Sequence, residues 1–147
     1  MERHKNLAPL SREHHRFLVL SQLLKTGAPN YKGLPTTSAG KMAYLNEVFE
    51  NTLLPHIWRE ENRLFPILRE YGPDLSELCD TLRNEHVNII GLIRKANNTR
   101  NIEAALDQIG VELALHIRKE ERQLFQLAQE LVPEKVLSEL RLGKIPG

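Results

Sequence analysis

Apolar residues recur at helical spacing along almost the whole chain, and runs of alternating apolar and polar residues are nearly absent. This pattern predicts an all-α protein. We expect four long helices, at about residues 11–26, 38–71, 73–96 and 101–131, followed by a short C-terminal helix at about residues 133–142. The 147 residues suit a single domain, residues 1–147.

Helix boundaries follow from capping residues and from glycine and proline. Ser11 is the expected N-cap of the first helix, and Gly72 and Pro73 end the second. Pro55 and Pro66 fall inside the second helix, where they predict local bends or a break. Short connections make successive helices antiparallel, so the expected architecture is an up-and-down four-helix bundle.

Polar side chains interrupt the apolar face of each predicted helix. At about 100° per residue, His14 lies on the apolar face of the first helix, whereas His15 is turned away from it. His86 lies at the centre of the apolar stripe of the third helix. The second and fourth helices each add a histidine and a glutamate, so six groups face the core: His14, His56, Glu60, His86, His116 and Glu120.

One motif occurs twice, because residues 56–65 and 116–125 share the pattern H-I-x-x-E-E-x-x-L-F. A histidine and a glutamate four residues apart lie on the same helix face and can reach a common ion. Buried carboxylates need a partner, and a metal ion is a better one than a set of protonated carboxyls and neutral histidines. Cys79 is the only cysteine, so the ligands are nitrogen and oxygen, which suit iron, manganese or zinc.

Other polar and aromatic residues receive simpler interpretations. Glu61 and Glu121 leave the inward stripe, which favours surface ion pairs over a role behind the ligands. Glu112 lies one turn before His116 and is expected to be partly exposed. The remaining residues are assigned to the core (Cys79), to packing against the loop or a partner subunit (Trp58) and to solvent (His4 and His15).

Composition excludes several classes of partner. Lys and Arg number 20 and Asp and Glu 19, so the net charge of +1 does not indicate binding to nucleic acid or to a membrane surface. No apolar run approaches the roughly 20 residues of a membrane span, and residues 1–10 lack the apolar core of a signal peptide. We therefore expect a cytoplasmic protein.

These motifs resemble the hemerythrin-like HHE cation-binding domains. The resemblance covers nearly the whole chain, from residues 10–14 through the two repeated motifs and Glu85-His86. It implies an up-and-down four-helix bundle with two non-heme iron ions, although other divalent metals are compatible. Glu60 and Glu120 would then bridge the ions, and four histidines would be terminal ligands: His14, His56, His86 and His116.

The chain departs from the oxygen-carrying hemerythrins, which have two histidines one turn apart on the third helix. Here His86 is followed by Ile90, and the fourth-helix carboxylate is Glu120 rather than a differently spaced aspartate. This departure argues against oxygen carriage. It favours a protein that senses, scavenges or stores oxygen, nitric oxide or iron. The alternatives are a di-iron enzyme acting on peroxide or nitric oxide, and a homodimeric interaction module with a structural metal or none.

Overall fold

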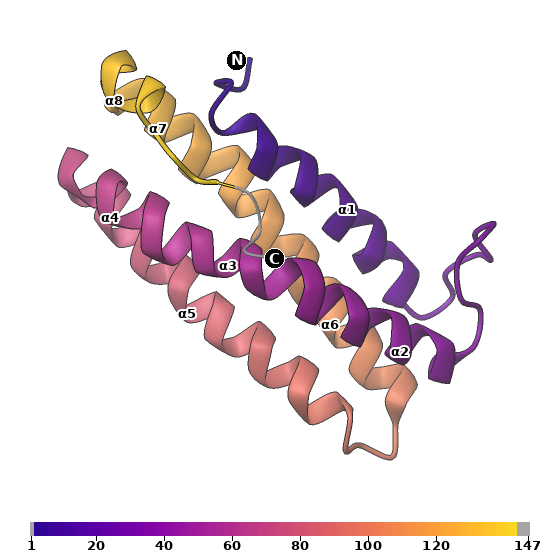
Figure 1. The fold of residues 1–147 in the computed structure, drawn as a ribbon. Helices are drawn as coiled ribbons and strands as arrows, with labels where there is room; N and C mark the ends of the chain where they lie inside the picture. The colour runs from indigo at the N-terminus through magenta and orange to yellow at the C-terminus, as the bar shows by residue number, and fades with distance from the viewer. Residues whose placement is uncertain (1, 144–147) are drawn as a thin grey trace.

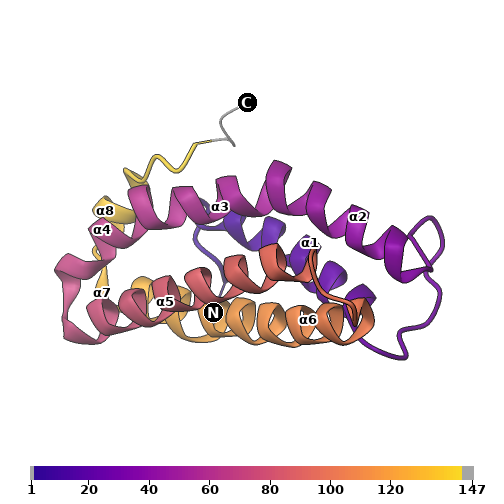
Figure 2. The same ribbon diagram turned by 90° about the horizontal axis from the view of Figure 1, so that it is seen from below.

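The computed structural model describes residues 2–143, which form helices joined by loops, with no strand among them. Four long helical runs lie side by side, and a short helix follows (Figures 1 and 2).

The first run is α1 (Ala8–Leu24) and the third is α5 (Pro73–Ala96). The others join α-helical segments through π-helical (η1, η2, η4) and 3₁₀ (η3) turns. The second run consists of α2 (Ser38–Val48), η1 (Phe49–Leu53), α3 (Leu54–Arg59), η2 (Glu60–Leu64), α4 (Phe65–Leu68) and η3 (Arg69–Tyr71). The fourth consists of α6 (Ile102–Lys119), η4 (Glu120–Leu124) and α7 (Phe125–Leu131), and α8 (Glu134–Ser138) follows it.

The helices pack in a definite order around the interior. α1 packs along α6, and α5 packs along both α6 and α4. α1 and the fourth run are antiparallel, because Ser11 bonds to Glu121 of η4 near one end while the backbone of Ser21 lies against Gly110 of α6 near the other. This arrangement brings the histidines and glutamates of distant sequence segments to the same level of the molecule.

In the middle of the chain the helices begin and end close to the expected residues, whereas the first and last helices differ from the expectation. Ser11 was expected to cap the first helix, but α1 begins at Ala8, and the hydroxyl of Ser11 instead donates to the Glu121 carboxylate at 2.8 Å. Thr37 and Asn101 do cap α2 and α6, each accepting a bond from a backbone N–H three residues later. The short terminal helix, expected at residues 133–142, comprises only Glu134–Ser138.

The second run stays helical through both of its prolines. Pro55 and Pro66 each fall in the first turn of the α-helical segment that follows a π-helical turn. The turn Glu120–Leu124 is also π-helical, at the matching place in the second motif, although no proline follows it. The π turns at Glu60 and Glu120 therefore accompany the repeated motif rather than its prolines.

The apolar core consists of two clusters of buried side chains. One contains Leu10, Phe65 and Phe125, and the other contains Phe17 and Ile117. In α1 the first cluster ends before His14 and the second begins after it, and the same division recurs in the other helices. A polar layer therefore separates the two halves of the core.

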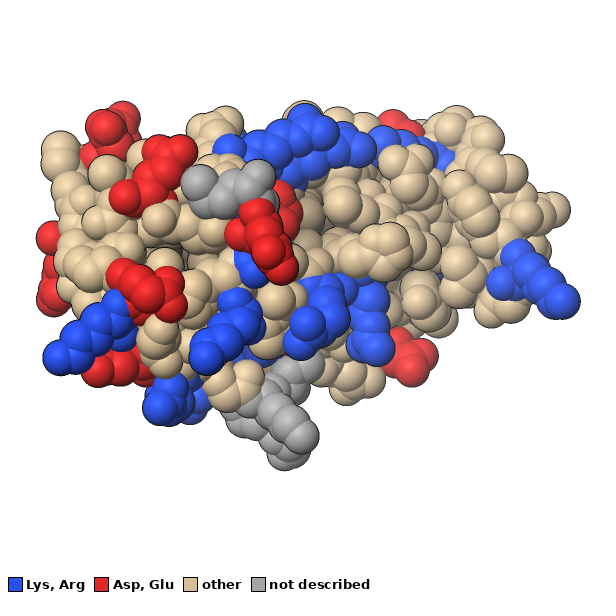
Figure 3. Space-filling view, turned by 90° about the horizontal axis from the view of Figure 1, so that it is seen from above, with Lys and Arg blue, Asp and Glu red and all other residues tan. Residues whose placement is uncertain are grey.

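The surface carries charges of both signs. In Figure 3 acidic side chains gather toward the end that carries α7 and α8, whereas lysine and arginine side chains lie over the middle of this face. This mixture agrees with the net charge of +1. No helix among residues 2–143 has the length and apolar character that crossing a membrane requires.

The close approach of α1 and α6 at Gly110 gives a test of the packing. A Cβ atom at this position would lie 2.6 Å from the backbone oxygen of Ser21, whereas a Cβ atom at Gly91 meets nothing within 4 Å. We expect Gly110→Ala to lower the free energy of unfolding by about 1–3 kcal/mol through overpacking. Gly91→Ala should raise it by up to about 1 kcal/mol through helix propensity. Urea denaturation of the two variants measures both effects, and equal effects would contradict this packing.

Candidate metal centre

The six side chains predicted to face the core meet in the polar layer between the two apolar clusters. Each is 0–4% exposed. His14 comes from α1, His86 from α5, and the repeated motif supplies the other four from the second and fourth runs. Glu60 and Glu120 are the first residues of the π turns η2 and η4.

These side chains form two groups that share both carboxylates. One group contains His14 and His56, the other contains His86 and His116, and Glu60 and Glu120 belong to both. Within each group, one potential ligand atom from every residue lies within 4.8 Å of the others. The arrangement provides two adjacent places for an ion, each with two nitrogen and two oxygen ligands.

Distances within the centre agree with shared ions. The Nε2 atoms of His14 and His56 are 3.0 Å apart. Two nitrogens at about 2.0–2.1 Å from one ion lie roughly 3 Å from each other. His86 Nε2 lies 3.2 Å from one oxygen of Glu60, and His56 Nε2 lies 3.4 Å from the other. Glu60 therefore presents one oxygen to each group.

Each histidine turns Nε2 inward and Nδ1 outward to a second carboxylate. An ionised carboxylate only accepts, so Nδ1–H donates, and Nε2 is left free to bind a metal ion. The Nδ1-to-oxygen distances are 2.6–2.8 Å. The pairs are His14 with Glu121, His56 with Glu13, His86 with Glu61, and His116 with Glu85.

Glu61 and Glu121 do form the expected ion pairs, with Arg83 and Arg3, but each also accepts a hydrogen bond from a histidine of the centre, so the role behind the ligands applies as well. Glu61 and Glu121 lie beside the inward-facing stripe of their helices, close to the neighbouring helix. The outward Nδ1 atoms of the histidines point to these positions. The sequence analysis assigned no orienting role to Glu13 or Glu85, although both lie in segments that carry the resemblance. A signal for them exists, because the dipeptide Glu-His occurs twice, each time upstream of one H-I-x-x-E-E motif.

Each of the four outer carboxylates also has a cation of its own. The pairs are Glu121 with Arg3, Glu13 with Arg59, Glu61 with Arg83, and Glu85 with Lys119. These cations balance the charge of the outer carboxylates. Among residues 2–143, no lysine or arginine forms an ion pair with Glu60 or Glu120, so with neutral histidines these two carboxylates carry a charge of −2 that no lysine or arginine of this part of the chain balances.

The pKa values follow from this charge distribution in the metal-free protein. Burial alone would lower the pKa of His86, but Glu120, Glu60 and Glu61 raise it to about 11. For His14 too, the neighbouring carboxylates outweigh burial and raise the pKa well above its usual value. The pKa values of His56 and His116 also rise. Burial and Glu120 act to raise the pKa of Glu60, but the neighbouring histidines bring it down to about 2.

The other candidates lie outside the centre. Cys79 is fully buried, as expected, and burial raises the pKa of its thiol to about 12. His15 is exposed, Trp58 is 46% exposed and Glu112 is partly exposed. The expectation that His4 is solvated was wrong. Its Nδ1 accepts from the N–H of Asn6, and its Nε2 contacts Glu134.

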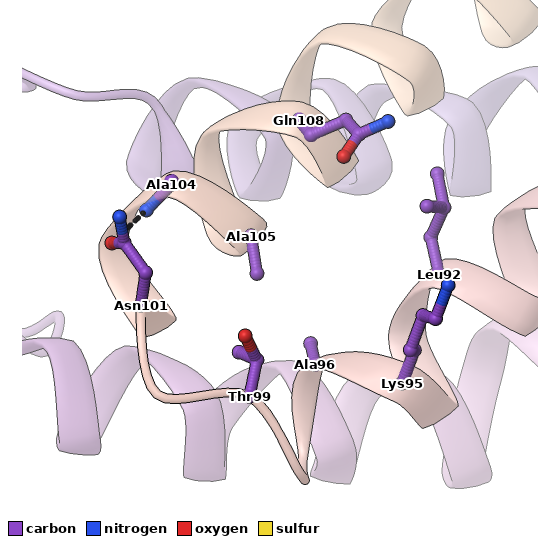
Figure 4. A pocket seen from close by; sticks show the side chains of 8 residues that line it. All are labelled: Leu92, Lys95, Ala96, Thr99, Asn101, Ala104, Ala105 and Gln108. Atoms are coloured by element: carbon purple, nitrogen blue, oxygen red, sulfur yellow. Dashed lines mark hydrogen bonds between the residues drawn. The ribbon is translucent and has the colours of Figure 1, made fainter.

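A surface hollow at the turn between α5 and α6 provides no comparable chemistry. It measures about 260 Å³, and Figure 4 shows the eight side chains that line it. Lys95 is the only titratable residue among them, and none belongs to the six residues of the centre. The hollow therefore offers no second set of metal ligands.

Comparison with known proteins identifies one family. Residues 5–129 match the family model described as hemerythrin HHE cation binding domain. No curated protein and no solved structure matches the chain. The matched segment contains all six residues of the centre.

The pKa shifts predict how the stability of the metal-free protein depends on pH. The raised histidine pKa values stabilise the fold fully below about pH 6.5, and this contribution is lost as the pH rises toward about 11 for His86. The lowered carboxyl values stabilise it above about pH 4.5, and this contribution is lost as the pH falls toward about 2 for Glu60. We therefore expect maximal stability between about pH 4.5 and 6.5.

Urea denaturation across pH 4–9 in the presence of a chelator checks this expectation. The metal-loaded protein should behave differently, because ions displace protons from the histidines and bind more tightly as the pH rises. A metal-free protein whose stability increases steadily from pH 6 to 9 would contradict the assignment.

Proposed function

The chain belongs to the hemerythrin HHE cation-binding domain family, and we propose that it is a non-heme di-iron protein. In this proposal a single domain folds as the up-and-down four-helix bundle that the sequence predicts. His14 and His56 bind one ion, His86 and His116 bind the other, and the carboxylates of Glu60 and Glu120 bridge them. The proposed role is to sense, scavenge or store a small ligand such as oxygen or nitric oxide, or iron itself.

One observation carries this proposal. All four carboxylate oxygens of Glu60 and Glu120 are buried and accept no well-formed hydrogen bond among the described residues. Their nearest polar neighbours are histidine Nε2 atoms, at 2.5 Å between His116 and Glu120 and 3.2 Å between His86 and Glu60. Unpaired buried carboxylates are strongly destabilising, because desolvation penalises their charge. Two cations among these oxygens and the four Nε2 atoms remove the penalty. Imidazole and carboxylate together suit iron, as well as manganese and zinc.

The surroundings favour a ligand of a few atoms. Bound iron would supply coordination positions and redox chemistry, while the protein supplies the ligands and excludes water. Phe65 stacks on His86, and Phe125 stacks on His14, with ring centroids 6.0 and 5.5 Å apart. Because the ligand residues are at most 4% exposed, diatomic molecules and peroxide fit this interior better than larger substrates.

Metal analysis tests the proposal directly. Protein expressed with ample iron should contain about two iron ions per chain, whereas Glu120→Ala should contain less than one, because both ions lose a ligand. His15→Ala is the matched control and should retain both ions, since His15 is exposed. Less than about one ion per chain in the parent protein would overturn the proposal.

Ligand addition then separates binding from catalysis. The reduced, iron-loaded protein should bind oxygen or nitric oxide with a stoichiometry fixed by the number of centres, as followed by visible absorption. An enzyme would instead consume its substrate over many turnovers. Sustained turnover of peroxide or nitric oxide would replace the binding role with an enzymatic one and leave the metal centre itself in place.

A further inference from the structure

The two halves of the centre have matching parts. Each half contributes a Glu-His dipeptide and an H-I-x-x-E-E motif, and in each half the dipeptide glutamate bonds to the motif histidine. The glutamate that follows each bridging residue bonds to the dipeptide histidine of the other half. If inner ligands alone decided affinity, the two ions would be held equally.

The cations behind the outer carboxylates differ between the two ions. On the His14/His56 side the cations are Arg59, whose side chain is 1% exposed, and Arg3, which is 17% exposed. On the His86/His116 side they are Lys119, which is 31% exposed, and Arg83, which is 65% exposed. The outer glutamates themselves are similarly exposed, at 19–27%, so the difference lies in the cations.

Further contacts hold Arg59 and Arg3 in place. Arg59 donates to the backbone oxygen of Gly143, in the segment that runs from α8 back toward α3 (Figure 1). Leu140 and Leu142 of that segment are buried in the core. Arg3 donates to Gln129 and to the backbone oxygen of Glu121, and its guanidinium lies 5.2 Å from the centre of the Phe125 ring.

The aromatic contacts show the same asymmetry. Phe17 lies edge-on against the His56 ring, with centroids 5.1 Å apart. Three residues after the histidine of each dipeptide, the first half has Phe17 and the second half has Ile89. The His14/His56 side therefore has less exposed cations and, in Phe17, a larger apolar side chain against its histidines.

We propose that the two ions are held unequally, the His14/His56 ion being retained and the His86/His116 ion being exchangeable. This inference rests on the proposed two-metal site. A carboxylate fixed by a buried arginine keeps its histidine ring oriented, so that Nε2 remains on the ion. Exposed ion pairs are weak and are screened by salt, so Glu85 and Glu61 restrain their histidines less. A free divalent ion, or a chelator that removes one, therefore acts first on the His86/His116 side.

Chelator-driven release of Zn²⁺ tests this inference without any assay of activity. Protein loaded with two Zn²⁺ ions is mixed rapidly with an excess of a coloured chelator, and we expect two kinetic phases of equal size. Single-site variants assign them, because His116→Ala should lose the fast phase and His56→Ala the slow one. Higher salt should accelerate the fast phase more than the slow one.

Substitution of the cations tests the cause. Arg3→Ala and Arg59→Ala should accelerate the slow phase by about 10- to 100-fold, the range by which outer-shell changes weaken metal sites. Lys119→Ala should affect only the fast phase. Arg69→Ala is the matched control, because its partner Asp80 holds no histidine, and it should change neither phase. Arg3 and Lys119 are partly exposed, so their variants remain informative if Arg59→Ala does not fold.

The outcomes separate this inference from the proposed function. Two Zn²⁺ ions released in one phase, or a slow phase that belongs to His86 and His116, would overturn the inference and leave the two-metal site intact. Less than about one bound Zn²⁺ per chain would overturn the two-metal site itself.

Discussion

Two fully buried carboxylates impose the main constraint on this protein. Glu60 and Glu120 lie at the centre of the helices, and their oxygens accept no well-formed hydrogen bond among the described residues. Such groups destabilise a fold unless charge or hydrogen bonds compensate them. Both apolar clusters stop at this layer, so the core is built around the carboxylates. Metal ions held among these oxygens and the histidine nitrogens would compensate their charge.

Charge is organised outward from this layer in successive steps. Each inward histidine is oriented by an outer carboxylate, and each outer carboxylate is balanced by an arginine or a lysine. Outer contacts of this kind set the tautomer and the direction of a ligand imidazole. The arginines and the lysine that pair with the outer carboxylates differ in burial. Two groups of inner side chains that are nearly identical therefore have different surroundings. The difference between the two groups therefore lies in the cations around the outer carboxylates, and not in the inner histidines and glutamates.

The π turns connect the repeated motif to the backbone. In both copies the first glutamate of the motif opens a π-helical turn, closed by a bond from the N–H of Phe65 or Phe125 to the glutamate carbonyl five residues earlier. Such turns are often found at functional sites. The leucine and phenylalanine that follow are both buried, so the turn directs two adjacent side chains into the core. Within the motif the turn occurs with and without a nearby proline, and a third π turn, η1, lies before the first copy of the motif.

Helical periodicity and the repeated motif determined the helices and all six inward groups, because both are local properties of spacing along a helix. The sequence by itself did not reveal that Glu61 and Glu121 orient histidines, since their partners lie on other helices. The burial of Arg59 was likewise decided by the packing of the segment after α8. Periodicity assigns a side chain to a face, but only tertiary structure decides which side chain of a neighbouring helix that face meets.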